Sequence, residues 1–255
     1  MAHSSGPSVR GLYRYPVKGL SPEPLERMPL RAGETAPFDR AYAIENGLGG
    51  FDPEHPSHLP KIHFLMLMRN ERLATLETRF DDVTETLIIL RAGKRVASGD
   101  LRTPIGRKMI EQFLAAYMQE ELRGAPRVVS APGHSFSDVA AKCLHVVSLA
   151  SLRELERVVG RPLNPLRFRP NLVIDGCDPW AERNWIGSPL QVGAVRLEVF
   201  KLTERCAATN VDPETGKRDM AILAALQRAF GHTDFGAYAR VTAGGTIALG
   251  DPVTV

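Results

Sequence analysis

Cysteine is scarce in this chain of 255 residues, which has only Cys143, Cys177 and Cys206. The count is odd, the spacing is wide and no CxxC pair occurs. The sequence therefore suggests neither a disulfide framework nor a structural zinc site. This usage of cysteine favours a reducing compartment.

Long apolar runs and a large excess of charge are also missing. No apolar stretch reaches the roughly 20 residues that a bilayer-spanning helix needs. The start, MAHSSGPSVRG, lacks the apolar segment of a secretory signal. The formal net charge of +3 is too small to indicate nucleic acid or an anionic membrane as a partner. We expect a soluble cytoplasmic protein that binds neither nucleic acid nor membrane.

What is present is an ordinary globular composition, with 44% hydrophobic and 24% charged residues. The length fits one large or two small domains. The first hundred residues contain many short alternating segments separated by turn residues, which predicts a β-barrel-like or twisted-sheet domain. The expected strands are 9–17, 25–30, 42–44, 62–68, 73–77, 86–90 and 94–98.

The second part of the chain predicts three helices among further strands. The first helix covers 103–122 with Pro104 in its first turn, and the second covers 148–159, capped by Ser148 and ended by Gly160. The third covers 219–229 with Asp219 as its cap. Strands are expected at 127–130, 144–147, 172–174 and 191–202, a strand, turn and strand at 246–255, and the domain boundary near residue 101.

The stretch 197–219 carries the clearest chemical signal. An alternating strand ends at Thr203, and a polar loop follows in which Cys206 stands directly behind Arg205. A thiol beside a fixed cation and loop amides is placed to act as a thiolate, which attacks electrophiles or binds a soft metal. The alternative is a buried structural cysteine. The polar neighbours of Cys206 make a poor apolar lining for it.

Several cations stand at the ends of predicted elements, where binding residues collect on β scaffolds. They are Lys18, Arg40, Arg167, Arg169 and Arg205. The alternative for each is a solvated surface side chain. Arg169 stands out because it precedes Pro170-Asn171 and an apolar strand, a rigid base that suits bidentate capture of a phosphate.

Two other patterns are weaker indications of a functional site. His55, His58 and His63 lie in one stretch without a cysteine or a carboxylate pair to complete a zinc site, so we interpret them as loop residues. His134, Ser135 and Asp138 are close in sequence, but no GxSxG motif supports a serine hydrolase.

Four motifs in order along the chain resemble the MOSC-domain family. They are YPVKG at 15–19, FRPNLVI at 168–174, RCAATNVDPETG at 205–216 and GDPV at 250–253. Within that family the chain is most similar to the molybdenum-cofactor proteins that include the mitochondrial amidoxime-reducing component and its bacterial relatives. Gly19 departs from the pattern, because relatives carry serine there.

The resemblance implies a β-rich α+β fold, in which a MOSC β-barrel domain at 101–255 packs against an N-terminal β-barrel-like domain at 9–100, with a few peripheral helices. It implies a molybdenum cofactor in its molybdopterin form, with Cys206 as the metal ligand, and it carries an expectation of pyridoxal phosphate binding. Asp212 is expected either as a proton-relay residue or as a turn former. The implied cofactor-binding residues are Lys18, Gly19, Arg40, Ser148, Ser151, Arg169, Asn171, Arg205, Thr209 and Asn210.

The implied activity is the reduction of N-hydroxylated small molecules. No ferredoxin domain follows the last motif, so we expect electrons to come from a separate ferredoxin- or flavin-type protein. Two alternatives stay open. Cys206 could carry a persulfide for sulfur transfer, or the protein could bind the cofactor without catalysis.

Overall fold

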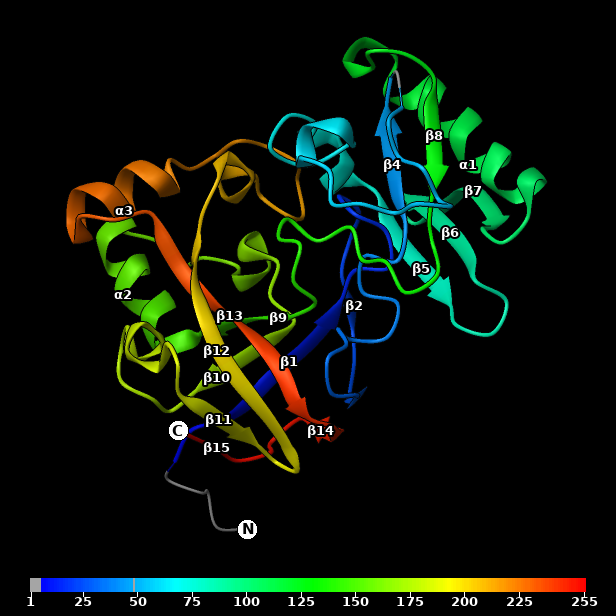
Figure 1. Ribbon diagram of the computed structural model, residues 1–255. Helices are drawn as coiled ribbons and strands as arrows, with labels where there is room; N and C mark the ends of the chain where they lie inside the picture. The colour runs from blue at the N-terminus through cyan, green and yellow to red at the C-terminus, as the bar shows by residue number, and fades with distance from the viewer. Residues whose placement is uncertain (1–5, 48) are drawn as a thin grey trace.

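A curled eight-stranded sheet dominates the computed structural model, which describes residues 6–47 and 49–255 (Figure 1). The fold is β-rich with three α-helices, as predicted. Within the sheet β9 and β10 run parallel, and the other paired strands run antiparallel. In spatial order its strands are β15 (Val253–Thr254), β11 (Pro189–Val192), β12 (Val195–Glu204), β13 (Asp234–Ala243), β9 (Leu144–Ser148), β10 (Leu172–Asp175), β1 (Ser8–Arg14) and β2 (Glu23–Pro24).

The strand that leads to Cys206 is β12, and its alternation is confirmed. Val195, Leu197 and Val199 are buried in the core of the large sheet, whereas Arg196 between them is exposed. The register with β13 shifts between Val199 and Lys201. A bulge of this kind re-aims the side chains that follow it. Lys201 is consequently exposed rather than buried beside Val199.

A second lobe is built from smaller sheets around its own apolar core (Figure 1). Helix α1 (Pro104–Tyr117) packs on this core, and the Thr103 hydroxyl caps it by accepting from the amide of Gly106. The predicted start of the helix is confirmed, but it ends at Tyr117 rather than at residue 122. The lobe's main strands are β4 (Ala43–Asn46) paired with β8 (Pro126–Val129), and the meander β5 (Glu77–Asp81), β6 (Thr86–Arg91) and β7 (Lys94–Asp100). A separate pair joins β3 (Arg27–Leu30) to β14 (Gly245–Ala248).

Helix α1 lies unusually close to β7. A methyl group added at Gly106 would sit 2.1 Å from the carbonyl oxygen of Asp100, and one added at Gly99 would sit 2.1 Å from that of Gly106. Only glycine at these two positions allows the two backbones to approach so closely.

The predictions between residues 62 and 77 are wrong. Instead of strands, the chain forms the short 3-10 helices Lys61–His63 and Glu71–Thr75, separated by a turn in which the amide of Asn70 donates to the carbonyl of Met66. The consecutive residues Phe64, Leu65 and Met66 are all buried. Burial on every side, rather than on alternate sides, produced the apolar run that resembles a strand.

Helices α2 (Leu149–Val159) and α3 (Ile222–Phe230) cover the large sheet on one side (Figure 1). The caps predicted for α2 are confirmed. The predicted cap of α3 is wrong, because Asn210 from the preceding loop accepts from the amide of Ile222 at 2.8 Å. Asp219 binds Arg167 instead.

The two lobes are interleaved along the chain. Strand β1 comes early in the sequence but pairs with β10 in the large sheet, whereas α1 comes later and packs in the other lobe. The division of the chain into domains 9–100 and 101–255 stays a prediction. Among the described residues, no helix is both long enough and apolar enough to cross a bilayer.

Candidate functional site

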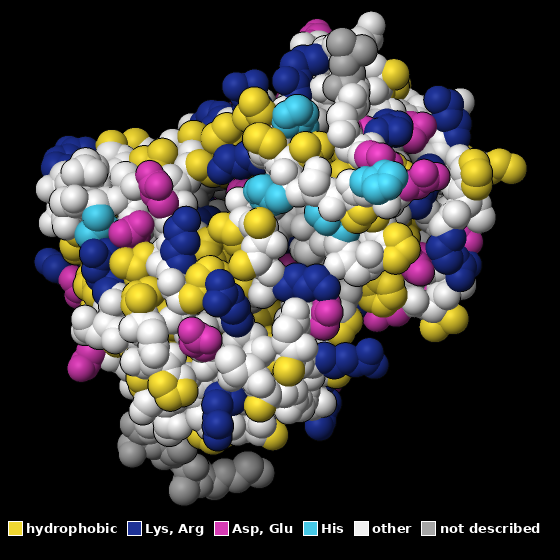
Figure 2. Space-filling view, in the orientation of Figure 1, with side chains coloured by type: hydrophobic (Ala, Val, Ile, Leu, Met, Phe, Trp, Pro, Cys, Tyr) yellow, Lys and Arg dark blue, Asp and Glu magenta, His cyan; other side chains and the backbone are white. Residues whose placement is uncertain are grey.

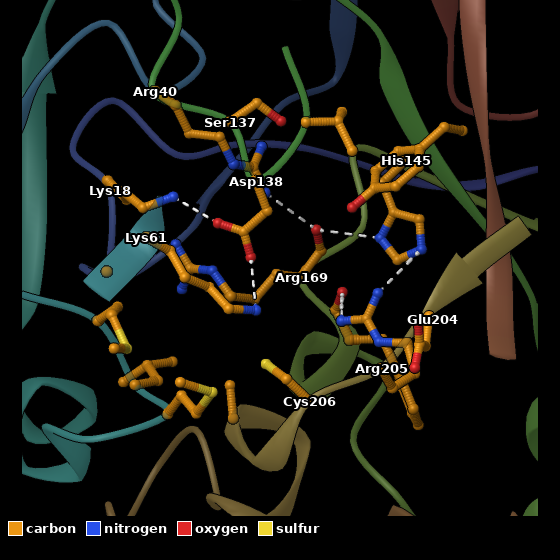
Figure 3. Close-up of a pocket in the computed structure, with 18 of the residues that line it drawn as sticks. Lys18, Arg40, Lys61, Ser137, Asp138, His145, Arg169, Glu204, Arg205 and Cys206 are labelled. Atoms are coloured by element: carbon orange, nitrogen blue, oxygen red, sulfur yellow. Dashed lines mark hydrogen bonds and ion pairs between the residues drawn. The ribbon is translucent and has the colours of Figure 1, made fainter. Parts of the chain in front are cut away.

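A pocket of about 230 Å³ draws its lining from both lobes (Figure 3). Six of its lining side chains are cationic and two are acidic, a difference of +4. On the face shown in Figure 2, Lys and Arg side chains lie along the junction of the lobes. The cationic residues are Lys18, Arg40, Lys61, Arg169, Lys201 and Arg205, and the acidic ones are Asp138 and Glu204.

Cys206 lies at the end of β12, immediately before the 3-10 helix Ala207–Asn210. Its thiol is free and half-buried, and Figure 3 shows the sulfur pointing into the pocket toward Lys61. Thr209 holds the backbone at this point, because its amide and hydroxyl donate to the Cys206 carbonyl at 3.1 and 3.0 Å. The loop therefore presents one fixed thiol to the pocket.

Arg40 and Arg169 both contact the buried ring of Tyr15, with guanidinium carbons 4.5 and 4.1 Å from its centroid. The backbone is left-handed at both arginines, with φ of 54° and 52°. Arg40 is neutralised by Asp39 at 2.5 Å. Among the described residues, the Arg169 guanidinium donates only to the carbonyl of Leu20, at 2.8 Å.

Arg169 is the least satisfied cation of the pocket. Its Nη2 is buried and has no hydrogen-bond partner within the part of the chain that the structure describes. Burial lowers the pKa of Arg169 to about 10, with Tyr15 opposing the shift and Arg40 adding to it. A guanidinium in this condition is ready to bind an anion.

Arg205 repeats the pattern. Its Nη2 donates to the carbonyl of Phe168 at 2.8 Å and its Nη1 lies 3.4 Å from Nε2 of His145, but its buried Nε has no partner among the described residues. Burial lowers the pKa of Arg205. Burial of His145 and the nearby charge of Arg205 hold the pKa of His145 well below its usual value. His145 is therefore neutral and adds no charge to the pocket.

The two lysines Lys18 and Lys61 meet at Asp138 (Figure 3). Its carboxylate accepts from Lys18 at 2.5 Å and from Lys61 at 3.4 Å. Burial opposes ionisation of Asp138, but the two lysines outweigh it and hold its pKa well below the usual range. Burial likewise opposes the charge of Lys61, and Asp138 and the Cys206 sulfur raise the pKa of Lys61 in spite of it. Lys61 is thus a fixed cation beside the thiol.

The sequence analysis missed Lys61, Asp138 and His145 as site residues. Asp138 was considered only as part of a hydrolase pattern, and Lys61 lies just before the predicted strand 62–68, in the stretch with three histidines that was interpreted as a loop. His145 carries no local motif. Contacts across 77 residues, such as that of Lys61 with Asp138, leave no trace in sequence spacing.

Gly19 and Asn171, both predicted to bind the cofactor, line the pocket. In the structure each also has a role in the fold. Gly19 has φ of 85°, and a Cβ there would lie 2.7 Å from the carbonyl oxygen of Leu65. A serine therefore does not fit this backbone. The side-chain Nδ2 of Asn171 donates to the carbonyl of Tyr13 at 3.1 Å, and its Oδ1 accepts from the backbone amide of His145 at 3.1 Å. It ties the pocket floor to two strands.

Five predicted residues do not line the pocket, because their polar groups are used elsewhere. Ser148 caps α2, Ser151 donates to Glu182, and Asn210 caps α3. The remaining two are Thr209, described above, and Asp212, whose carboxylate closes the turn at Glu214-Thr215 and binds Arg167. The hydrogen bonds of these residues are therefore made within the protein, away from the residues that line the pocket.

A larger cavity of about 1,090 Å³ has Asp39 among its lining residues and lies elsewhere in the protein. Its charges are largely matched within the protein: Glu34 pairs with Lys142, and Glu85 accepts from Tyr42. No cysteine is among its described lining residues. The smaller cationic pocket is therefore the better candidate site.

The described residues contain no group of three or more His, Cys, Asp or Glu side chains arranged to hold a metal. His55 pairs with Asp52 at the surface. A metal bound through Cys206 must therefore bring most of its ligands with it, as a metal within an organic cofactor does. The unpaired guanidinium donors fit the phosphate of such a cofactor, so the donor set is consistent with a molybdenum cofactor. Pyridoxal phosphate binding stays a prediction.

Comparison with known proteins points the same way. Residues 131–254 match the family described as MOSC domain. The human mitochondrial amidoxime-reducing component 1 is 35% identical over 120 residues, which cover 42% of this chain and 35% of the relative. The mitochondrial amidoxime reducing component 2 of Macaca fascicularis is 30% identical over 122 residues, covering 43% and 36%. The matches thus span about a third of the length of these relatives.

Two further similarities complete the comparison. A molybdenum cofactor sulfurase of Oryza sativa subsp. japonica is 35% identical over 80 residues, covering 29% of this chain and 10% of the relative. The crystal structure of the YUAD protein from Bacillus subtilis superposes over 97% of this chain and 93% of its own, with 13% identity and a TM-score of 0.48. On the family match and the amidoxime-reducing relatives, residues 131–254 of this chain are similar to a MOSC domain, and part of the chain resembles the amidoxime-reducing components.

Proposed function

We propose that this protein is an oxidoreductase that binds a molybdenum cofactor through Cys206 and reduces N-hydroxylated small molecules. The observation that carries the proposal is the position of the Cys206 thiol. It lies in a pocket whose arginines have buried N–H donors without a hydrogen-bond partner among the described residues. The names of the amidoxime-reducing relatives support the choice of reaction.

The residues divide into two roles. Arg169 and Arg205 would hold the phosphate of the pterin, because each has a buried guanidinium nitrogen without a partner among the described residues. Cys206 would supply the one protein ligand to the metal. The bound cofactor would supply the two-electron redox chemistry that side chains cannot provide.

The proposed reaction breaks the N–O bond of the substrate. Two electrons and two protons convert the N-hydroxyl group to N–H and release the oxygen as water. The electrons would come from a separate ferredoxin- or flavin-type protein. Lys61, held by Asp138 at 3.4 Å, keeps its ammonium group beside Cys206 and can donate a hydrogen bond to the departing oxygen. Cys143 and Tyr238, which also line the pocket, have pKa values raised by burial and stay neutral.

The first experiment measures molybdenum and pterin in protein purified from a host that makes the cofactor. The parent is compared with Cys206→Ser and with Cys177→Ser, whose thiol contacts Ser148 and is not among the pocket residues. We expect near one molybdenum per chain in the parent and the control, and a large loss in Cys206→Ser. Reduction of an amidoxime with a reduced viologen as electron source then tests the reaction. A Cys206→Ser protein that keeps both metal and activity would exclude the proposal.

Sulfur transfer is the second candidate, and two observations favour it. The Cys206 thiol is half-buried and free, as a persulfide carrier requires, and one relative is named molybdenum cofactor sulfurase. Mass spectrometry distinguishes the two. Protein without molybdenum that carries one additional sulfur atom at Cys206 would support this candidate. Bound molybdenum without turnover would indicate a non-catalytic cofactor-binding protein.

A further inference from the structure

Arg218 joins the two lobes close to Cys206. Arg218 lies in the loop that follows Cys206, and its Nη1 donates to the carbonyl of Ala207 at 3.1 Å. Its Nη2 crosses to the other lobe, where it donates to the carbonyl of Met68 at 2.7 Å and approaches that of Leu67 at 3.2 Å. The same nitrogen lies 3.0 Å from the carboxylate of Glu71. One guanidinium therefore binds the residue after Cys206 and a segment of the opposite lobe.

The segment that Arg218 holds is a wall of the pocket. Met66, Leu67 and Met68 line the cavity together with Cys206 and Ala208. This wall, which we call the Met66–Met68 wall, belongs to no strand, and it is shaped by a local turn closed by Asn70. Within the described chain, its direct hydrogen bonds to the Cys206 lobe come from Arg218. The position of the wall relative to the thiol therefore depends on this side chain.

The arm that carries Arg218 is itself rigid. Arg218 bridges to Val211 in a short antiparallel return, and the carboxylate of Asp212 closes the turn between them. The turn meets the other lobe at Gly216, where a Cβ would lie 2.8 Å from the side chain of Thr75. Arg218 thus reaches across from a fixed base.

We propose that Arg218 is a positioning residue that sets the clearance between the Met66–Met68 wall and the Cys206 sulfur, and with it the size of the molecule that reaches the sulfur. The assignment goes beyond the proposed function, because it concerns access to the thiol and holds for either candidate reaction. Arginine suits the role because its planar fork serves several acceptors at fixed angles, which a lysine ammonium on a flexible stem does not.

The test measures access to Cys206 directly, in full-length protein from a host unable to make the cofactor. N-Methylmaleimide and N-pyrenylmaleimide share one reactive group and differ in size. Peptide mass spectrometry follows labelling at Cys206 separately from that at Cys143 and Cys177. The quantity of interest is the ratio of the bulky to the small reagent's rate, since any change in the reactivity of the thiol itself affects both rates and cancels.

We expect this ratio to rise about tenfold or more in Arg218→Ala, the scale of losing one charged hydrogen bond. Arg218→Lys keeps the charge and should show most of the same rise, because the fork is lost. The matched control is Arg161→Ala. The Arg161 side chain binds Asp219 in the same lobe and does not reach the wall. Its ratio should stay at the parent value.

A ratio within about twofold of the parent in Arg218→Ala would overturn the proposal. If that variant does not fold, Arg218→Lys decides in its place by the same threshold. A rise in the Arg161→Ala control equal to that in the Arg218 variants would also overturn it, because general loosening would then be the cause.

Discussion

Replacing Arg169 with methionine should make the protein more stable while weakening the pocket as an anion site. The guanidinium is buried, its nearest acceptor is the carbonyl of Leu20, and it forms no ion pair with a described carboxylate. Lowering its pKa from 12.5 to about 10 corresponds to a penalty on the order of 3 kcal/mol for holding the charge. Loss of the bond to Leu20 costs about 1 kcal/mol. The net gain is roughly 2 kcal/mol.

The sign follows from the direction of the pKa shift. A base whose pKa is lower in the folded state than in the unfolded chain penalises folding at every pH below its folded pKa. The penalty of Arg169 is therefore fully present at neutral pH and fades only as the pH rises through about 10. In a chain of this length the gain raises Tm by about 4–8 °C at pH 7. Differential scanning calorimetry measures it.

Inorganic phosphate should reveal the cost to binding. Loss of one charged hydrogen bond weakens affinity about 10–100-fold, so phosphate that raises the Tm of the parent should have little effect on Arg169→Met. Arg40→Met should behave in the opposite way and lose about 3–5 kcal/mol, because buried Asp39 loses its partner. Arg157→Met, which disturbs only a surface pair with Glu154, is the control with unchanged Tm. A lower Tm in Arg169→Met together with undiminished stabilisation by phosphate would refute the reasoning.

Three further predictions follow from the same geometry. His145 is held neutral in the folded protein, whereas the unfolded chain gains a proton on this group below pH 6.5. As the pH falls, the parent should therefore lose about 1.4 kcal/mol of its free energy of unfolding per pH unit. Urea unfolding between pH 5 and 6.5 should find this slope absent in His145→Gln. Gly106→Ala places a Cβ 2.1 Å from a backbone oxygen and should cost about 3 kcal/mol or more in chemical denaturation, whereas Gly50→Ala, with open space around it, should cost little. Tyr15→Phe keeps the ring under the two arginines and should bind phosphate as the parent does, whereas Tyr15→Leu should bind about tenfold more weakly in calorimetric titration; equal affinities would show that the ring does not position them.

Local signals were sufficient where the structure is local. The starts of α1 and α2 follow from Thr103, Pro104 and Ser148, because a cap and its helix are adjacent in the chain. The start of α3 could not be found in this way. Its cap comes from Asn210, twelve residues before the amide that it binds, and only the folded loop brings the two together.

The site divides along the same line. Cys206 and Arg169 were recognisable because their own neighbours set their chemistry, a strand end in one case and a proline-bounded turn in the other. Lys61 was not recognisable, since its partners Asp138 and Cys206 lie far along the chain. The roles predicted for Ser148 and Asn210 at the cofactor stay predictions. Sequence similarity identifies polar residues near a site, but a helix cap uses the same side chain that a ligand would need.

The pairing of β1 with β10 also sets a timetable for synthesis. Val9 pairs with Ile174, so the first strand leaves the ribosome about 165 residues before its partner. At 5–20 residues per second the wait is roughly 10–30 s. During that time a strand with free backbone groups has no sheet to join. The nascent chain therefore passes through a period in which β1 is exposed, because the fold cannot yet supply its partner strand.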